Sequence, residues 1–404
     1  MNSIYGKYSL HNFVYTIKCL LSKCIWVIYK MARGNIQSYF NENGLQYFVD
    51  LEMSPEFNPK PFLYKWNPYF LKWGIKVSSV VSEYYSQMSG IRSDLYLTRN
   101  IAFNYIYPYL TRYEFIPAYA DKNMETRLLD IHKVKEDIAI HLPEIIVNNA
   151  NGIFFDKDDK EIDKESAIKI ILLHQDDMII KPSTGTYGGK GVMKISRKEL
   201  TEKTIEKLLE QYNSNYTIQQ IVKQHPDLAS FNESSVNTIR IVTFRNSQKK
   251  RRILYSLIRY GGKGAINDNV CSGGGFTVIT PEGKLKDRIK HVYKTMKCPT
   301  LHSKAVNEIP YWNRIKEAAL LLHGKLPHFD IVGWDFSLTP EGIPVLIEYN
   351  IRPGVGLQQA VGPMFTEEEL DDIMSKVSKM KTQFESYPSV TFPDKLGFKS
   401  NWVK

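Results

Sequence analysis

The chain has 404 residues, of which 43% are hydrophobic and 24% charged, a composition that excludes wholesale disorder and allows two or three domains. The 53 basic and 43 acidic side chains leave a net charge of +10, which favours anionic partners such as nucleic acid, phosphorylated ligands or acidic membranes. The four cysteines have neither disulfide-framework nor zinc-site spacing, so we expect a reducing, cytoplasmic location.

The first 33 residues carry five basic side chains and no acidic one. At 100° per residue Lys18, Lys23 and Lys30 share one face of a helix, and the apolar residues around them share the other. The lysines leave no apolar run long enough to span a membrane, and the segment lacks the features of a signal peptide. Two interpretations stay open: an interfacial helix on an anionic membrane, or a helix whose apolar face packs on the domain behind it.

The remaining sequence predicts an α+β protein with mainly antiparallel strands. Strands are expected at 178–182, 217–222, 238–244, 252–258, 275–280, 331–338 and 344–350. Helices are expected at 76–91, 95–107, 123–129, 164–174, 198–212, 311–323 and 366–380. These elements divide the chain into a helical region (1–110), a mixed segment (111–177), a segment with a glycine-rich loop (178–235), a strand-rich segment (236–385) and a tail (386–404).

The glycine-rich loop follows the strand that ends in Lys181 and Pro182. It holds four glycines in the seven residues 185–191, with Lys190 among them. Glycine lets backbone N–H groups turn toward an anion, and the flanking lysines supply charges for phosphate oxygens. The spacing matches neither a P-loop nor the dinucleotide-binding fingerprint, and a flexible hairpin turn is the alternative interpretation.

A hairpin is expected over residues 331–350, with a turn at TPEG. If its strands pair from Leu338 onward, Asp335 lies opposite Leu346 and Glu348 is its diagonal neighbour on the same face. The other face is then apolar and holds Trp334, Phe336, Leu338, Val345, Ile347 and Tyr349.

The polar face of this hairpin gathers Asp335, Glu348 and, one pleat further, Asn350. Two carboxylates and an amide oxygen suit Mg²⁺, which takes oxygen ligands and shares its coordination shell with phosphates. A one-sided sheet with ordinary polar surface residues is the alternative.

Arg240 lies in the strand TIRIVTF, where its guanidinium could hold a phosphate or acyl-phosphate oxygen or serve a structural role. Cys271 has no histidine beside it, and the sequence contains neither HExxH nor GxSxG. These absences disfavour a side-chain nucleophile, with the Cys271 thiol as the alternative.

As a set, these motifs resemble the ATP-grasp superfamily, and most closely its sugar-transfer-associated branch. The resemblance covers about residues 115–365 and rests on ADKN (120–123), IIKPSTGTYGGKGV (179–192), IQQIVKQHP (218–226), SVNTIRIVTF (235–244), the loop 268–275, VGWDFSLTPEG (332–342) and VLIEYNIRPG (345–354). It implies a fold in which two α+β subdomains clasp ATP, with 178–235 as the lid subdomain and 236–385 as the catalytic subdomain.

The resemblance also implies which residues bind the nucleotide. Phosphates would contact Lys122 and Lys181, and the loop with Gly188, Gly189 and Lys190 would close over them. Gln220 and the backbone near Val222 would hold adenine, and Asp227 the ribose hydroxyls. Gln220 stands where many members of the family carry an acid, although its amide can also hydrogen-bond the adenine amino group.

For the reaction, the resemblance implies that Asp335, Glu348 and Asn350 hold one or two Mg²⁺ ions. Arg240, Asn269 and Arg352 would face the transferred phosphate and the acceptor. Such enzymes phosphorylate a carboxylate with ATP and let an amine or thiol displace the phosphate.

The expected substrates are thus a small-molecule or saccharide carboxylate and an amine, with no nucleic-acid partner. The branch's association with polysaccharide gene clusters implies a step in capsule or exopolysaccharide production, such as joining an amino acid to a sugar carboxylate. Two alternatives stay open: an ATP-dependent kinase of a sugar or polyol hydroxyl, which would share the ATP site, and a non-catalytic glycan-binding protein, which would have no use for the carboxylate–amide set.

Overall fold

The structure, a computed structural model, describes residues 36–42, 45–51, 61, 65–129, 138–185, 189–262, 264–265, 268, 275–290 and 306–386. The predicted basic helix within residues 1–33 and three residues singled out above, Gly188, Asn269 and Cys271, lie outside this part of the chain. The chain divides into two compact units, Met1–Tyr96 and Leu97–Lys404. Each unit is described by itself.

The N-terminal unit contains a hairpin and two helices. Strands β1 (Ile36–Glu42) and β2 (Leu45–Leu51) pair antiparallel, a hairpin that the sequence pattern did not predict. Helix α2 spans Pro68–Leu71, and α3 spans Val80–Ser89 within the predicted 76–91. Gly90 ends α3 with φ 77°, a left-handed conformation that glycine adopts without strain.

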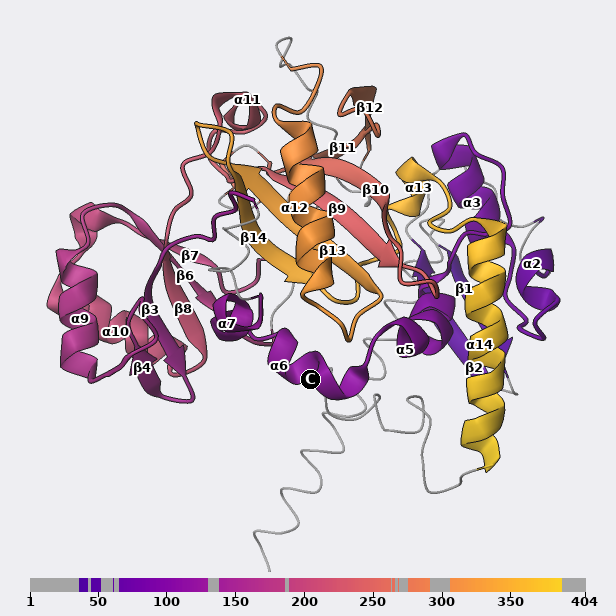
Figure 1. Cartoon of the computed structure of the whole chain (residues 1–404), viewed down its shortest axis with the longest axis horizontal. Coiled ribbons are helices and arrows are strands. Elements are labelled where there is room, and N and C mark those ends of the chain that lie inside the picture. The colour runs from indigo at the N-terminus through magenta and orange to yellow at the C-terminus, as the bar shows by residue number, and fades with distance from the viewer. Residues whose placement is uncertain are drawn as a thin grey trace, which may run out of the picture. The chain divides into compact units, whose positions relative to one another are not determined.

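Two six-stranded antiparallel sheets organise the second unit (Figure 1). Sheet I has the order β5-β4-β3-β8-β6-β7 and consists of β3 (Ile145–Ala150), β4 (Ile153–Phe155), β5 (Glu161–Ile162), β6 (Met178–Pro182), β7 (Met193–Ile195) and β8 (Tyr216–Gln220). Sheet II has the order β12-β11-β10-β9-β13-β14 and consists of β9 (Thr238–Arg245), β10 (Arg251–Tyr260), β11 (Gly275–Ile279), β12 (Leu285–Lys290), β13 (Ile331–Leu338) and β14 (Pro344–Asn350). The seven predicted strands are therefore confirmed, and so is their antiparallel pairing.

Helices precede, connect and follow these sheets. The α-helices are α4 (Arg99–Ile101), α5 (Tyr107–Leu110), α6 (Ile116–Tyr119), α7 (Glu125–Leu129), α9 (Lys164–Leu173), α10 (Glu202–Tyr212), α11 (Pro226–Ala229), α12 (Trp312–Gly324), α13 (Gln358–Val361) and α14 (Glu367–Ser386). A π-helical turn, η2 (Ala102–Ile106), and three 3₁₀ turns, η3 (Tyr113–Phe115), η4 (Lys122–Met124) and η5 (Arg197–Glu199), complete them.

Sheet I buries one face against α9 and α10. A capping box between Thr201 and Thr204 starts α10 and satisfies backbone groups that a helix end leaves free. Ile205, Leu208 and Leu209 recur at helical spacing and pack into the apolar core under the sheet. This packing leaves the opposite face of sheet I to carry the site.

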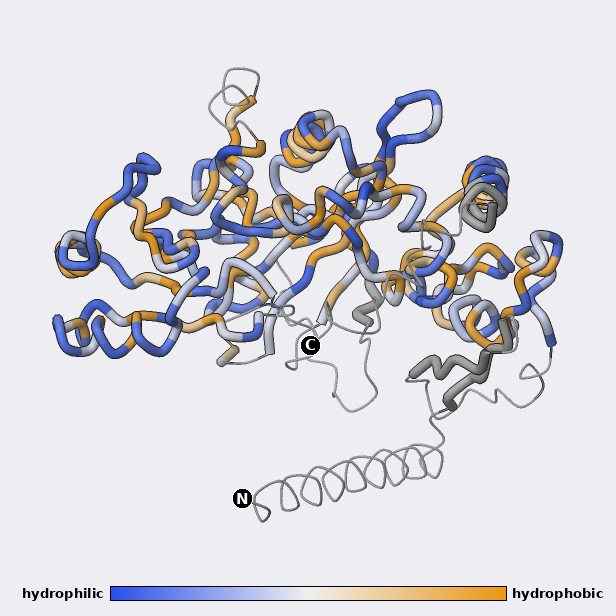
Figure 2. The backbone as a smooth tube through the Cα atoms, turned by 90° about the horizontal axis from the view of Figure 1, so that it is seen from below, coloured by the Kyte–Doolittle hydropathy of each residue, from blue (hydrophilic) through white to orange (hydrophobic). Residues whose placement is uncertain are grey.

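Sheet II buries one face against α12, which lies across β9 and β13 (Figure 1). Its core includes Trp334 and Phe336 from β13 and Ile315 and Leu322 from α12, all fully or almost fully buried. Figure 2 shows hydrophobic and hydrophilic residues interleaved along the described helices and strands, as elements with one buried face require.

The β13–β14 hairpin pairs differently from the prediction. Leu338 pairs with Pro344, and an irregularity beside Asp335 brings Glu348 directly opposite that residue. The predicted pairing of Asp335 with Leu346 was wrong. The turn offsets the predicted pairing by one residue, and the bulge, which adds a residue to β14, offsets it by a second. Strict alternation along a sequence anticipates neither shift.

The pairing of Leu338 with Pro344 also corrects the predicted apolar face, because it places Leu346 opposite Phe336. Leu346 packs in the core with Phe336, whereas Ile347, expected in the core, borders a pocket beside Glu348. Val345 is buried but lies outside that core cluster.

Among the helices of the described residues, none combines the length and the apolar character that crossing a membrane requires.

Candidate active site

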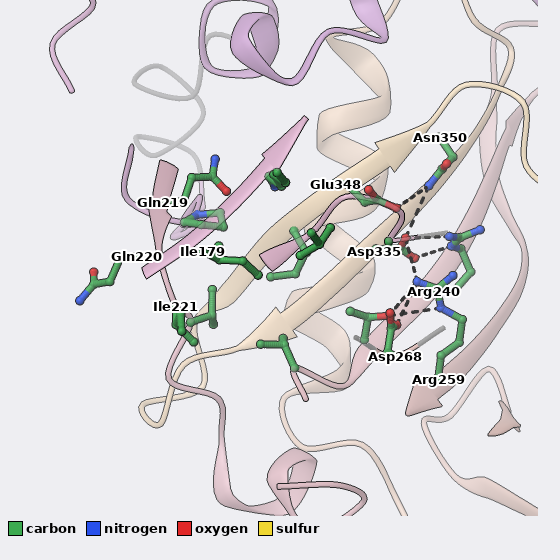
Figure 3. Close-up of a pocket in the computed structure, with 18 of the residues that line it drawn as sticks. Ile179, Gln219, Gln220, Ile221, Arg240, Arg259, Asp268, Asp335, Glu348 and Asn350 are labelled. Carbon is green, nitrogen blue, oxygen red and sulfur yellow. Dashed lines mark hydrogen bonds and ion pairs between the residues drawn. The ribbon is translucent and has the colours of Figure 1, made fainter. Parts of the chain in front are cut away.

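A pocket of about 340 Å³ lies between the free face of sheet I and sheet II (Figure 3). Strands β6 and β8 contribute one wall, and strands β9, β10, β13 and β14 contribute the other. Two antiparallel sheets with helices on their outer faces thus leave one shared inner space, where side chains from distant parts of the sequence meet.

One end of the pocket is apolar. Ile179 and Ile221 lie at this end, away from Asp335 and Arg240 (Figure 3), and the other apolar residues that line the pocket are Pro143, Val192, Val222, Val236 and Ile347. They come from both walls, so a flat aromatic group can be covered on its two faces while its edge meets backbone groups of the segment after β8. Val222, predicted beside adenine, lies at this end.

Two neighbouring glutamines border the apolar end with different orientations. Gln219 pairs across the sheet with Ile179 and is 5% exposed. Gln220 borders the pocket as well, but its amide points away and donates to Asp176 Oδ2 at 3.4 Å (Figure 3). Gln219, which the sequence pattern did not single out, is therefore the glutamine whose side chain faces the pocket. Alternation along β8 was the signal that could have found it.

Lys181 lies on the same wall, further from the apolar end. It is 9% exposed and lines the pocket, and burial lowers the pKa of its ammonium group while the charge of Glu125 opposes this shift. The backbone N–H of Lys122 donates to Ser183 O at 3.0 Å, which docks η4 against the end of β6. The two predicted phosphate-binding lysines thus lie on neighbouring segments, but only Lys181 is among the residues that line the pocket.

Glu125 is the carboxylate of this neighbourhood, and sequence analysis missed it. It begins α7, is 8% exposed, and burial raises its pKa to about 7, against the opposing charges of Lys181 and Lys122. Its position three residues after Lys122, on the same side of a helical turn, was the available signal.

The glycine-rich loop is described on both sides of its centre. Gly189 lines the pocket, whereas Lys190 is exposed and is absent from the lining. Gly191 has φ 77°, and a Cβ there would lie 2.9 Å from the Pro182 ring, so the return of the loop requires glycine.

The other end of the pocket is charged. Asp335 and Glu348 face each other across β13 and β14, and the amide of Asn350 lies 3.5 Å from Asp335 Oδ2 and 3.4 Å from Glu348 Oε1. The three side chains predicted as metal ligands therefore converge (Figure 3). No trio of His, Cys, Asp and Glu suited to a metal occurs in the described residues, since the third donor here is an amide.

Two arginines form ion pairs with the carboxylate of Asp335. Arg240 binds it through Nε and, at 2.7 Å, through Nη2, and Arg259 Nη2 lies 3.0 Å from Asp335 Oδ2. Asp335 is fully buried, which alone would raise the pKa of its carboxyl group, but the two guanidiniums hold that pKa below its usual value. Asp335 is therefore ionised and paired.

Arg259 was not predicted as a site residue. It pairs with Thr238 across β9 and β10, and its guanidinium also lies 3.0 Å from Asp268 Oδ2 and from Thr238 Oγ1. The pairing of two strands that are separated by a turn decides this contact, and no local motif marks it.

Arg352 lines the pocket beside Gly354, and its guanidinium lies 5.5 Å from the centre of the Tyr113 ring. Tyr107 donates its hydroxyl to Pro353 O in the same loop. Asp227 does not line the pocket: it lies in α11, with its backbone N–H donating to His225 Nδ1 at 3.2 Å.

The donor set of this end fits Mg²⁺. Carboxylate and amide oxygens are its usual protein ligands, and Asn350 can present Oδ1 in place of Nδ2 by a half turn of its amide. Asp335, Glu348 and Asn350 would hold the ion, with Lys181 on the facing wall.

Comparison with known proteins supplies one family match. Residues 100–374 match the model of a family described as sugar-transfer associated ATP-grasp. Every residue that lines the pocket falls within this range. No curated protein matches the sequence.

Solved structures with a similar fold include D-cycloserine synthetase DcsG (14% identity, 66% of this chain and 73% of that one, TM-score 0.39). The D-Ala:D-Ser ligase VanG from Enterococcus faecalis has 14% identity over 65% of this chain and 62% of its own, with a TM-score of 0.39. D-alanine–D-alanine ligase from Bacillus anthracis has 15% identity over 66% and 70%, with a TM-score of 0.36. The match thus spans less than two thirds of the VanG chain.

Proposed function

The chain belongs to the sugar-transfer associated ATP-grasp family, and from this premise we propose that it is an ATP-dependent carboxylate–amine ligase that works through an acyl phosphate. The predicted α+β ATP-grasp fold is confirmed by the family and by the two antiparallel sheets. The substrate we propose is a saccharide carboxylate joined to an amine, as in a step of capsule or exopolysaccharide production. The family's description as sugar-transfer associated supports the saccharide.

The observation that carries the proposal is the division of one pocket into an apolar end and a charged end. The apolar end suits a nucleobase, Lys181 lies between, and Asp335, Glu348 and Asn350 lie at the charged end. Mg·ATP presents the same order of chemistry: a flat base, phosphates and a divalent cation.

Arginines at the charged end favour a carboxylate over a hydroxyl as the acceptor. Arg240, Arg259 and Arg352 all line this end. A guanidinium binds a carboxylate or phosphate through two parallel hydrogen bonds, whereas a neutral hydroxyl offers no such match. These arginines therefore support the ligase over the kinase alternative.

In the proposed reaction a carboxylate oxygen of the substrate attacks the γ-phosphorus of ATP, the bond from that phosphorus to the bridging oxygen breaks, and ADP leaves. The amine then attacks the acyl carbon, the C–N bond forms, the C–O bond to phosphate breaks, and the amine loses a proton. Mg²⁺, when bound, supplies charge neutralisation for the phosphates. Lys181 binds phosphate oxygens, and Arg240 stabilises the oxyanion of the acyl centre.

The first test of the proposal is nucleotide binding. A ligand that binds only the folded chain at a hundredfold excess over its Kd stabilises it by about 2.7 kcal/mol, so millimolar Mg·ATP should raise the melting temperature by several degrees. EDTA should abolish the rise. An unchanged melting temperature would remove the nucleotide-binding function.

The second test identifies the reaction. ADP release is measured with uronic-acid sugars and amino acids, with hydroxylamine as a general nucleophile. An acyl phosphate is expected to be trapped as a hydroxamate, only in the presence of a carboxylate. A stable phosphorylated alcohol without hydroxamate would identify a kinase and contradict the proposal.

A further inference from the structure

Asp335 is fully engaged by arginines in this structure. Its Oδ1 accepts from Arg240 Nε, and its Oδ2 accepts from Arg240 Nη2 at 2.7 Å and from Arg259 Nη2 at 3.0 Å. The carboxylate is 0% exposed, and the side chain of Arg240 is 8% exposed. A cation that binds Asp335 must therefore replace hydrogen bonds that charge strengthens and burial shields from water.

The two arginines are held unequally. Within the described residues, both hydrogen-bonding groups of Arg240 that have partners bind Asp335. Arg259 also binds Thr238 Oγ1 at 3.0 Å and lies 3.0 Å from Asp268 Oδ2. If Asp335 bound a cation in place of the arginines, Arg259 would keep its contacts with Thr238 and Asp268, whereas the guanidinium of Arg240 would be free to turn.

The charge of the pocket disfavours a bare cation. Four cationic side chains line it, Lys181, Arg240, Arg259 and Arg352, against three carboxylates, Asp268, Asp335 and Glu348. Mg·ATP is a net anion, and its phosphate oxygens can accept the hydrogen bonds that Arg240 now gives to Asp335. A free divalent cation brings no such acceptor.

We propose that Arg240 and Arg259 form a latch on Asp335 that excludes a free divalent cation and opens only to a cation that arrives with the nucleotide. On opening, Arg240 turns to an oxyanion in the pocket, and Arg259 stays on Thr238 and Asp268 as the positioning residue for Asp335. This inference rests on the proposed function, because it assumes that Asp335 binds the cation of a metal–nucleotide complex.

The test uses the full chain and Mn²⁺, whose free concentration is followed by electron paramagnetic resonance. Without nucleotide, the wild-type chain should bind no Mn²⁺ at Asp335 below about millimolar concentration, and the non-hydrolysable analogue AMP-PNP should restore binding. Arg240→Gln should tighten nucleotide-free Mn²⁺ binding by roughly tenfold or more, within the usual range of coupling between sites. Arg240→Lys keeps the charge but loses the planar guanidinium with its paired donors, so its nucleotide-free Mn²⁺ affinity should lie between those of the wild type and Arg240→Gln.

Arg252→Gln is the matched control. It removes the same charge from sheet II, but Arg252 pairs with Glu369 and lies outside the pocket. It should bind Mn²⁺ as the wild type does. Equal tightening in Arg252→Gln and Arg240→Gln would overturn the latch, since the effect would then be one of overall charge.

A measurement on the wild type keeps the inference falsifiable if Arg240→Gln fails to fold. Nucleotide-free Mn²⁺ binding below about millimolar concentration that Asp335→Asn abolishes would contradict the latch and leave the proposed function intact. Failure of Mn·AMP-PNP to bind at all would instead contradict the proposed function.

Discussion

The two walls of the pocket are both antiparallel sheets, but they carry different kinds of side chain. Sheet I lines the pocket with apolar side chains, one buried lysine and the uncharged residues of β8. Sheet II offers arginines and carboxylates in direct pairs, each oriented by its neighbour on the next strand. Under the proposed function, sheet I would recognise the nucleotide by shape, and sheet II would carry the charges that the reaction needs.

The difference has a physical basis in how each sheet neutralises the charged side chains that it buries. Asp335 and Arg240 are buried in sheet II because each neutralises the other across β13 and β9, which are paired at these two residues. Lys181 in sheet I has no carboxylate on a neighbouring strand, and the carboxyl groups that oppose the lowering of its pKa are those of Glu125, on α7, and Glu348, in sheet II. Removing a charge from sheet II should therefore affect chemistry, and removing one from sheet I should affect binding.

The largest expected effect is on sheet II. Glu348→Gln keeps the size of the side chain but removes one charge from the carboxylate pair, and activity should fall at least about a hundredfold, or about 2.7 kcal/mol in the activation free energy. ADP release measures the loss, and circular dichroism should show an unchanged fold. Glu341→Gln, an exposed position at the turn of the same hairpin, is the control. Full activity in Glu348→Gln would place the metal site elsewhere.

Lys181→Met should weaken nucleotide binding about 10- to 100-fold, because a charge-assisted hydrogen bond to phosphate contributes about 1.5–3 kcal/mol. Isothermal titration calorimetry with Mg·AMP-PNP measures the change. Lys194→Met removes an exposed lysine from β7 in the same sheet and should leave the affinity unchanged. If both variants bind Mg·AMP-PNP equally well, the proposal that sheet I binds the nucleotide through Lys181 is wrong.

Glu125 should make the stability of the free chain depend on pH. Burial raises its pKa to about 7 from 4.5, so the folded chain keeps a proton that the unfolded chain has lost. The contribution of Glu125 to the unfolding free energy is then largest below about pH 4.5 and is lost as the pH rises through 7. Between pH 5.5 and 8 the wild type should lose about 2 kcal/mol more than Glu125→Gln.

Urea denaturation at the two pH values measures this difference. Burial also lowers the pKa of His323 to about 4, but this residue is common to both proteins and cancels in the comparison. Glu165→Gln, an exposed position in the first turn of α9, should behave as the wild type does. A parallel pH profile for Glu125→Gln and the wild type would mean that Glu125 ionises freely in the folded chain.

The smallest expected effect separates the two glutamines of β8. Gln219→Leu should weaken ATP binding and its preference over GTP by roughly 3- to 10-fold, the range of one neutral hydrogen bond. Gln220→Leu should change neither by more than about twofold, because its amide already bonds Asp176 outside the pocket. The reverse result would restore Gln220 as the residue that reads the base.

The sequence by itself determined the positions of seven of the twelve strands in the two sheets, and the family. Runs of β-branched and aromatic residues fixed β6, β8, β9, β10, β11, β13 and β14, because such patterns depend on neighbours along the chain. The convergence of Asp335, Glu348 and Asn350 was also predictable, since one hairpin carries all three.

Three features follow from the tertiary structure alone. They are the bulge beside Asp335, the ion pair between Arg259 and Asp335, and the burial of Glu125 near the charge of Lys181. Each depends on how separate strands or helices are brought together, which side-chain periodicity within one element does not encode. Short-range alternation could therefore name the side chains proposed to bind the cation, but only the pairing of β9, β10 and β13 placed two arginines beside the most buried of them.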